Sequence, residues 1–141
     1  MCMQFWPGLE YQQLSLLPQL QAEGFTTHAI DPHEDDAAAI QAIAKTAPVN
    51  WLVVDHYGLD AAWERAVQGS VMNILVIDDL ADRRHDCDVL ADQNLGRNAR
   101  DYDALVPAGT QLLIGPAYAL LRPEFARART AALARRAEGG P

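Results

Sequence analysis

Basic residues are scarce in this 141-residue sequence. Eleven Lys and Arg residues stand against nineteen Asp and Glu residues, which gives a formal net charge of −8 and an isoelectric point of about 4.7. Proteins that bind a phosphate backbone need a basic surface. We therefore expect no nucleic-acid partner.

Long apolar runs and cysteines are also few. No stretch approaches the roughly 20 apolar residues of a membrane span, and the N-terminus lacks the basic start and apolar core of a signal peptide. The only cysteines, Cys2 and Cys87, form neither a metal spacing nor a disulfide framework. These features predict reduced thiols, a cytoplasmic location and no membrane partner.

Several sequence signatures of ligand sites are missing. The chain has no Gly-rich phosphate loop of the Rossmann or Walker type, no Cys/His cluster and no Gly-x-Ser-x-Gly elbow. We therefore expect no metal, no cofactor and no nucleotide-phosphate site built by this chain alone.

The residues that are present predict one α/β domain. Hydrophobic residues make up 50% of the chain, and segments with helical spacing alternate with short β-branched runs. A first helix is expected at 14–24, ending at Gly24. A second is expected at 31–47, with Asp31 as its N-cap and with Ile40, Ile43 and Ala47 on its apolar face. A third is expected at 60–68, with Asp60 as its N-cap and with Trp63 and Val67 buried. Strands are expected at 25–30, 51–55, 73–78, 87–93 and 111–115, with 51–55 buried on both faces. This order is typical of a Rossmann-like, mostly parallel sheet.

One short pattern occurs twice, as LVVD at 52–55 and LVID at 75–78, with a single expected helix between the copies. This arrangement is one βαβ step. Because parallel strands end at the same edge of a sheet, Asp55 and Asp78 are expected to emerge together where open α/β sheets bind ligands.

Polar side chains with useful chemistry follow the first of these strands. Asp55, His56, Tyr57 and Gly58 supply a carboxylate, an imidazole and a phenol next to a glycine. The plainer interpretation is that the Asp caps a turn and the His is simply hydrogen-bonded.

Carboxylates are dense after the second strand, between Asp78 and Asp92, which raises the question of Mg²⁺. Their spacing fits no known metal loop, so most are expected in solvated turns, with Asp78 and Asp79 as the exceptions at a strand end. His85 is expected in packed or surface structure, and His28 and His33 carry no functional signal.

The end of the chain differs in charge. Five of the eleven basic residues, Arg122, Arg127, Arg129, Arg135 and Arg136, lie after position 121. We predict a domain over 1–121 and a connecting helix with a tail over 122–141, the helix starting near Pro123.

Four stretches in order carry a family resemblance: WLVVDHYGLDAAWE, ILVIDDLADRRHDCDVLADQNLGRN, DYDALVP and LLIGPAYALLRPEF. Together they resemble the UDP-2,4-diacetamido-2,4,6-trideoxy-β-L-altropyranose hydrolases of pseudaminic acid biosynthesis, from about Gln19 to Arg129. The resemblance implies a GT-B-like enzyme of two Rossmann-like domains. Its members release UDP and the free sugar by water attack with inversion, and need no metal.

The resemblance also assigns site residues. It places the Asp-His-Tyr-Gly motif on the first-domain side of the cleft, with Tyr57 close to the sugar. Tyr57 and His56 are the predicted catalytic residues. The predicted substrate-binding residues are Asp55, Gly58, Asp78, Asp79 and Asn94.

The sequence departs from the family pattern in two respects. It contains no Gly-Gly-His or Gly-x-Gly-His loop, which carries the His regarded as the family's base, and it ends at Pro141 before a UDP-binding second domain. We therefore expect a partial N-terminal half of the GT-B-like fold without its opening βα unit, inactive alone and able to self-associate through an exposed sheet edge.

Two alternatives belong to other classes. One is a non-catalytic α/β interaction module derived from the same fold. The other is a phosphotransfer protein that uses Asp78 or Asp79 with Mg²⁺.

Overall fold

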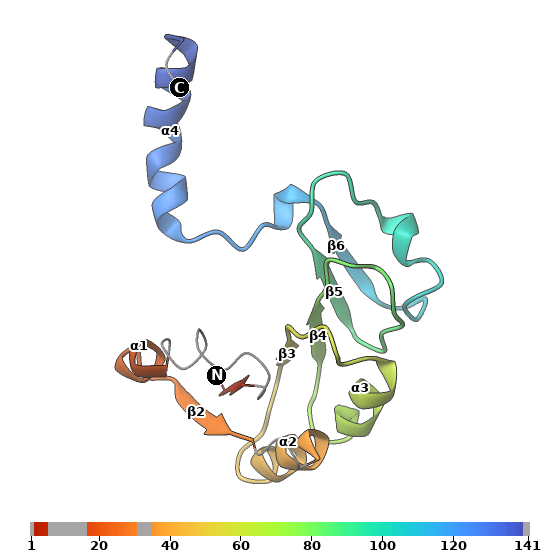
Figure 1. Cartoon of the computed structure of the whole chain (residues 1–141). Coiled ribbons are helices and arrows are strands. Elements are labelled where there is room, and N and C mark those ends of the chain that lie inside the picture. The colour runs from red at the N-terminus through yellow and green to blue at the C-terminus, as the bar shows by residue number, and fades with distance from the viewer. Residues whose placement is uncertain (1, 6–16, 31–34, 140–141) are drawn as a thin grey trace.

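The computed structural model describes residues 2–5, 17–30 and 35–139. In this part of the chain, two parallel sheets are present (Figure 1). The smaller pairs β1 (Cys2–Phe5) with β2 (Thr26–Ala29), and the larger has the order β3-β4-β5-β6. The larger sheet consists of β3 (Leu52–Val54), β4 (Ile74–Ile77), β5 (Val89–Asp92) and β6 (Gln111–Ile114). A mixed α/β fold with a four-stranded parallel sheet is confirmed and is consistent with a Rossmann-like domain.

The helices are α1 (Leu17–Ala22), α2 (Asp36–Ala44), α3 (Ala61–Gln68) and α4 (Pro123–Ala137), with short 3₁₀ turns η1 (Ala99–Tyr102) and η2 (Pro116–Tyr118). The N-cap of α3 is Asp60, as predicted, since its carboxylate accepts hydrogen bonds from the amides of Ala62 and Trp63. Gly24 follows α1 with the expected left-handed conformation (φ +84°).

Helices α2 and α3 lie side by side and are joined by polar contacts. The indole Nε1 of Trp63 donates to Asp36 Oδ1 at 2.7 Å, and Gln41 Nε2 donates to the Ala66 carbonyl at 2.8 Å. Val67 of α3 is fully buried against the sheet core, whereas Trp63 is only partly buried. The predicted burial of α3 is therefore confirmed for Val67 and partial for Trp63.

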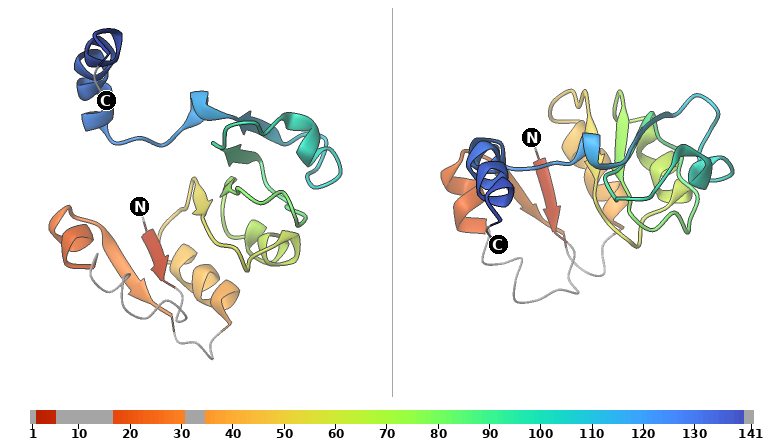
Figure 2. Two further views of the ribbon diagram at one scale, coloured as in Figure 1. Left: turned by 45° about the horizontal axis from the view of Figure 1, so that its top comes forward. Right: turned by 90° about the horizontal axis from the view of Figure 1, so that it is seen from above.

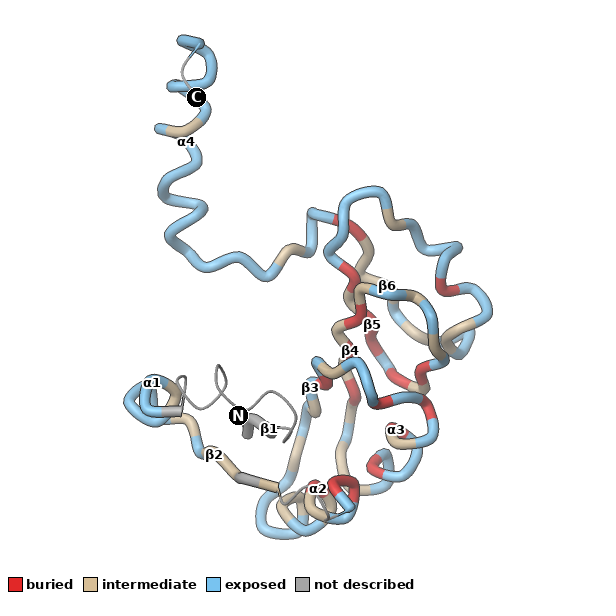
Figure 3. The backbone as a smooth tube through the Cα atoms, in the orientation of Figure 1, coloured by how far each residue is buried: buried red, intermediate tan, exposed pale blue. Residues whose placement is uncertain are grey.

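The core lies around β4 and β5, where buried positions concentrate (Figure 3). Ile74 and Val76 of β4, Leu90 of β5 and Tyr102 of η1 are almost completely inaccessible to solvent. In contrast, α4 has no buried residue and projects away from the larger sheet (Figures 1 and 2). Its first residue, Pro123, agrees with the predicted start of this helix.

Two local predictions were wrong. The strand at β3 is not buried on both faces: Val54 is buried, but Val53, whose side chain points to the opposite face, is 50% exposed because the described elements leave that face uncovered. The helix expected from Asp31 begins at Asp36, because Asp35 supplies the capping carboxylate, and it ends at Ala44, so Ala47 is outside the helix and exposed. Asp31 and His33 lie outside the described residues.

None of the described helices combines the length and the apolar character required to cross a bilayer.

Candidate functional site

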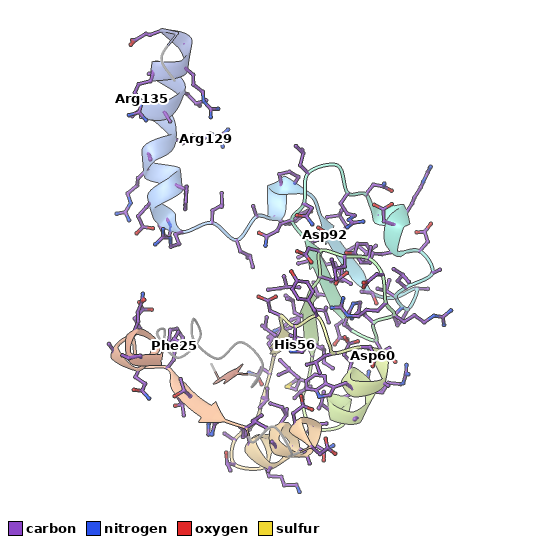
Figure 4. The ribbon with its side chains drawn as sticks, viewed as in Figure 1. Phe25, His56, Asp60, Asp92, Arg129 and Arg135 are labelled. Atoms are coloured by element: carbon purple, nitrogen blue, oxygen red, sulfur yellow. The ribbon has the colours of Figure 1, made fainter. Side chains whose placement is uncertain are left out.

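The ends of β3, β4 and β5 form a pocket at one edge of the larger sheet. Because these strands are parallel and in register, Asp55 and Asp78 emerge at the same edge, as predicted. Figure 4 shows His56 just beyond β3 and Asp92 at the end of β5. The pocket is lined by residues that directly follow or end the strands: Asp55, His56, Tyr57, Ile77, Asp78, Asp79, Gln93 and Asn94.

Tyr57 and Asp79 are in direct contact in this pocket. The Tyr57 side chain is 66% exposed, and its hydroxyl donates a hydrogen bond to Asp79 Oδ2 at 3.1 Å. The bond to the Asp79 carboxylate, and the negative charge of that group, raise the pKa of the Tyr57 phenol above its ordinary value. Tyr57 is therefore a neutral phenol near pH 7.

His56 and Gly58 form a tight turn beside this pair. The ring Nδ1 of His56 accepts a hydrogen bond from the Gly58 amide at 2.9 Å, so in the neutral ring the proton is on Nε2. A Cβ at position 58 would lie 2.9 Å from His56 Cε1. Glycine at this position therefore lets the imidazole pack against the backbone.

Arg83 joins the loops that follow β3 and β4, a role that sequence analysis missed. Its guanidinium donates to the carbonyls of Leu59 (2.9 Å) and His56 (3.0 Å) and forms an ion pair with Asp78 Oδ1 at 2.8 Å. The available signal was a pair of arginines, Arg83 and Arg84, among the carboxylates of DDLADRRHD, although the pattern does not say which of the two turns inward. Arg83 therefore fixes the turn that presents Tyr57.

Asp78 lies below the pocket surface, with its side chain fully buried. Burial alone would raise the pKa of this carboxyl, but hydrogen bonds from the Ala81 amide and the Tyr102 hydroxyl and the charge of Arg83 outweigh it and lower the pKa. Asp78 is therefore an ionised structural anchor. Substrate contact by its carboxylate stays a prediction, and it would require this side chain to become accessible.

Tyr102 connects the ends of β4 and β5 beneath the pocket, and sequence analysis missed it because it comes from a distant 3₁₀ turn. Its buried hydroxyl is 3.0 Å from Asp78 Oδ2 and 2.9 Å from Asp92 Oδ2. Asp92 is also paired with Arg97, whose Nε is 2.8 Å from Asp92 Oδ2. Both buried carboxylates thus have a cationic partner.

The loop after β5 holds Asp79 from the other side. Asn94 Nδ2 donates to the Asp79 carbonyl at 3.2 Å, and the guanidinium Nη2 of Arg97 donates to the same oxygen at 2.7 Å. The backbone amide of Asn94 donates to Asp92 Oδ1 at 2.9 Å, which fixes the start of this loop. The structure therefore brings Asp79 and Asn94, two of the predicted site residues, together with Tyr57.

His85 lies away from the pocket surface, in agreement with the packed interpretation. It is buried, and its Nδ1 is 2.7 Å from Glu64 Oε1 of α3. His28 is in β2 and has no place in the pocket.

No group of three or more His, Cys, Asp or Glu side chains is arranged to hold a metal ion within the described ranges 2–5, 17–30 and 35–139. An Asp-dependent phosphotransfer reaction would need an accessible carboxylate with bound Mg²⁺. The buried, ion-paired Asp78 does not offer an accessible carboxylate, and the carboxylate of Asp79 is already hydrogen-bonded to the Tyr57 hydroxyl.

Comparison with known proteins gives one relative of stated function. The chain is 37% identical over 75 residues to the UDP-2,4-diacetamido-2,4,6-trideoxy-β-L-altropyranose hydrolase of Campylobacter jejuni. The match covers 52% of this chain and only 27% of the relative's length. No family model matches the chain. The similarity supports a relationship with this hydrolase family, the same family that the four sequence stretches resemble.

Proposed function

We propose that this chain is part of an enzyme that hydrolyses a UDP-activated 2,4-diacetamido-2,4,6-trideoxy sugar to UDP and the free sugar. The observation that carries the proposal is the 37% identity over 75 residues to a hydrolase of that name. The chain would supply part of the N-terminal half of a GT-B-like fold, acting in the cytoplasm in pseudaminic acid biosynthesis. The proposal includes no metal or cofactor.

The pocket geometry supports a role in holding the sugar and the attacking water. Tyr57 is exposed and is anchored by Asp79, while the His56 turn is anchored by Arg83. We assign Tyr57 and His56 to the catalytic side of the pocket. The sugar would be bound by four further residues: Asp55, Gly58, Asp79 and Asn94. Asp78 would stabilise this side of the pocket from below, through its ion pair with Arg83.

In the reaction we propose, a water oxygen attacks the anomeric carbon while the bond from that carbon to the UDP oxygen breaks, with inversion. One water proton passes to a base, and UDP leaves with the bonding electron pair. The neutral Tyr57 phenol can accept a hydrogen bond from the water and orient it. We predict that the 141-residue chain alone lacks the base and the UDP-binding groups and does not turn over.

The test is release of UDP from UDP-2,4-diacetamido-2,4,6-trideoxy-β-L-altropyranose, measured chromatographically. A longer protein that contains this chain should turn over, and its Tyr57→Phe variant should lose about 10- to 100-fold in kcat, the value of one transition-state hydrogen bond. Tyr118→Phe is the matched control, because Tyr118 is also exposed but does not line the pocket.

Each outcome decides between the proposals. Turnover by the isolated chain would disprove inactivity alone while supporting the hydrolase. Absence of UDP release by every longer protein containing the chain would favour the non-catalytic α/β module instead. An unchanged rate for Tyr57→Phe would remove Tyr57 from the site.

We also propose self-association through the β3 edge. The Leu52 amide donates to Asn73 on the β4 side, so the alternating backbone groups of Val53 face away from β4, and the Val53 side chain is half exposed. Sedimentation velocity should show mass rising with concentration, and Val53→Lys should abolish the rise. Leu133→Lys on α4 is the control; if it alone abolishes association, the interface is α4.

A further inference from the structure

We propose that Asp79 is a positioning residue that holds the Tyr57 proton, so that Tyr57 meets its ligand only as a hydrogen-bond acceptor. This inference rests on the proposed function for the identity of the ligand, but the Asp79–Tyr57 relationship can be tested without it.

The Asp79 carboxylate is paired with the Tyr57 hydroxyl. Its Oδ2 receives the Tyr57 hydroxyl at 3.1 Å. Its Oδ1 is shielded from solvent and has no hydrogen-bond partner among the described residues. Within the described residues, the Tyr57 hydroxyl is therefore the side-chain donor recorded for this carboxylate.

Asp79 is fixed at its backbone. Asn94 and Arg97 both donate to its carbonyl oxygen, and Arg97 is itself paired with the buried Asp92. The loop that carries the Asp79 carboxylate is thus held in place, whereas Tyr57 follows the neighbouring strand β3 and has an exposed ring. Arg83 holds the turn that carries Tyr57, and Asp79 orients its exposed hydroxyl.

The chemical consequence follows from the single proton of a phenol. When that proton is donated to Asp79, the Tyr57 oxygen has only lone pairs to offer. Tyr57 therefore cannot protonate a leaving UDP oxygen. Its ligand must bring the proton, as the attacking water, a sugar hydroxyl or an acetamido N–H does.

The charges around the pocket also favour neutral ligand groups that donate a hydrogen bond. Asp55 and Asp79 both line it. The two cations recorded beside these loops, Arg83 and Arg97, are already engaged by the buried carboxylates of Asp78 and Asp92 and by backbone carbonyls. A diphosphate would be repelled from such a wall, whereas neutral N–H and O–H groups would be bound. We infer that this pocket selects the donor-bearing sugar and excludes the phosphates.

The test of the pair uses the 141-residue chain with ¹³Cζ-labelled tyrosine, followed by NMR during a pH titration. Tyr57→Phe identifies the Tyr57 resonance. In the unsubstituted chain Tyr57 should titrate above its ordinary value, and Asp79→Asn should move the titration back towards it. Asp55→Asn is the matched control, since it removes a nearby carboxylate that makes no hydrogen bond to Tyr57, and should produce a smaller shift. Equal shifts in the two variants, or no shift in Asp79→Asn, would overturn the proposal.

A second measurement separates the pair from the reaction. In a longer protein that hydrolyses the UDP-sugar, Asp79→Asn should lower kcat about tenfold, and adding it to Tyr57→Phe should cost little more. Independent, multiplicative losses would contradict positioning through Tyr57. If the NMR result is as expected but no longer protein releases UDP, the proposed function fails and the positioning of Tyr57 stands.

Discussion

The imidazole Nδ1 of His85 lies 2.7 Å from Glu64 Oε1, with both side chains fully buried. Glu64 comes from α3 and His85 from the loop after β4, and the second oxygen of Glu64 accepts the Asp86 amide. One carboxylate therefore attaches the carboxylate-rich loop to the helix. This attachment stabilises the loop that carries Arg83 and, through it, the Tyr57 turn.

Loss of the Glu64 carboxylate should destabilise the chain. We expect Glu64→Ala to lower the free energy of unfolding by about 3–5 kcal/mol, the usual cost of breaking a buried pair, and Glu64→Gln to cost less. Urea denaturation followed by circular dichroism measures both. Glu124→Ala on exposed α4 is the control and should change stability by about 0.5 kcal/mol or less. Equal effects of Glu64→Ala and Glu124→Ala would contradict the structural role.

Asp78 should make the free energy of unfolding depend on pH in the acidic range. Because its pKa is lower in the folded chain than in the unfolded chain, its contribution is present above the unfolded value of about 4 and is lost as pH falls through the folded value. The free energy of unfolding should therefore decline below about pH 4, and less steeply in Asp78→Asn. If that variant does not fold, ¹³Cγ titration of Asp78 in the unsubstituted chain gives its folded pKa directly. A folded pKa at or above the ordinary value would refute this prediction.

The Tyr102 hydroxyl should contribute to stability more than an exposed tyrosine does. Tyr102→Phe removes a buried donor from between Asp78 and Asp92, with an expected cost of about 1–3 kcal/mol. Urea denaturation of Tyr102→Phe and Tyr118→Phe compares a buried hydroxyl with one on a side chain that is half exposed. Similar values for the two variants would show that the buried carboxylates do not need this hydroxyl.

Cys87 should be unreactive until the chain unfolds. Burial, and then the nearby carboxylates, raise its pKa to about 12, so very little thiolate forms at pH 8. In a Cys2→Ser background, iodoacetamide labelling followed by mass spectrometry should be slow in buffer and fast in urea. Rapid labelling of the folded chain would show that the thiol is accessible.

Local sequence signals predicted the elements well where a short-range cause exists. Asp60 caps α3 because the geometry of an N-cap involves only neighbouring residues, and the β-branched runs at β3 and β4 needed no knowledge of the rest of the chain. The predicted start at Asp31 failed because Asp35 is an equally good cap, and local pattern does not choose between them.

The positions of the candidate site residues could be predicted in part, while their roles stay predictions. The repeated LVVD and LVID stretches correctly placed Asp55 and Asp78 at one sheet edge, because the direction of parallel strands determines where they end. Both Asp78 and Asp79 line the pocket, but the sequence did not show that the Asp79 side chain contacts Tyr57 while the Asp78 side chain is buried. That difference depends on Tyr102, which comes from η1, and on Arg83, whose guanidinium folds back onto Asp78 from further along the same loop.

The sequence by itself determined the alternation of strands and helices, the caps and the row of polar residues at the strand ends. These properties depend on backbone preference and on hydrophobic spacing within a few residues. Only the tertiary structure decided that Val53 is half exposed at the β3 end of the four-stranded sheet, that Tyr102 joins two carboxylates and that Tyr57 donates to Asp79. Such contacts join residues 10 to 24 positions apart, and they form only once packing has fixed which loops meet and which charges leave water.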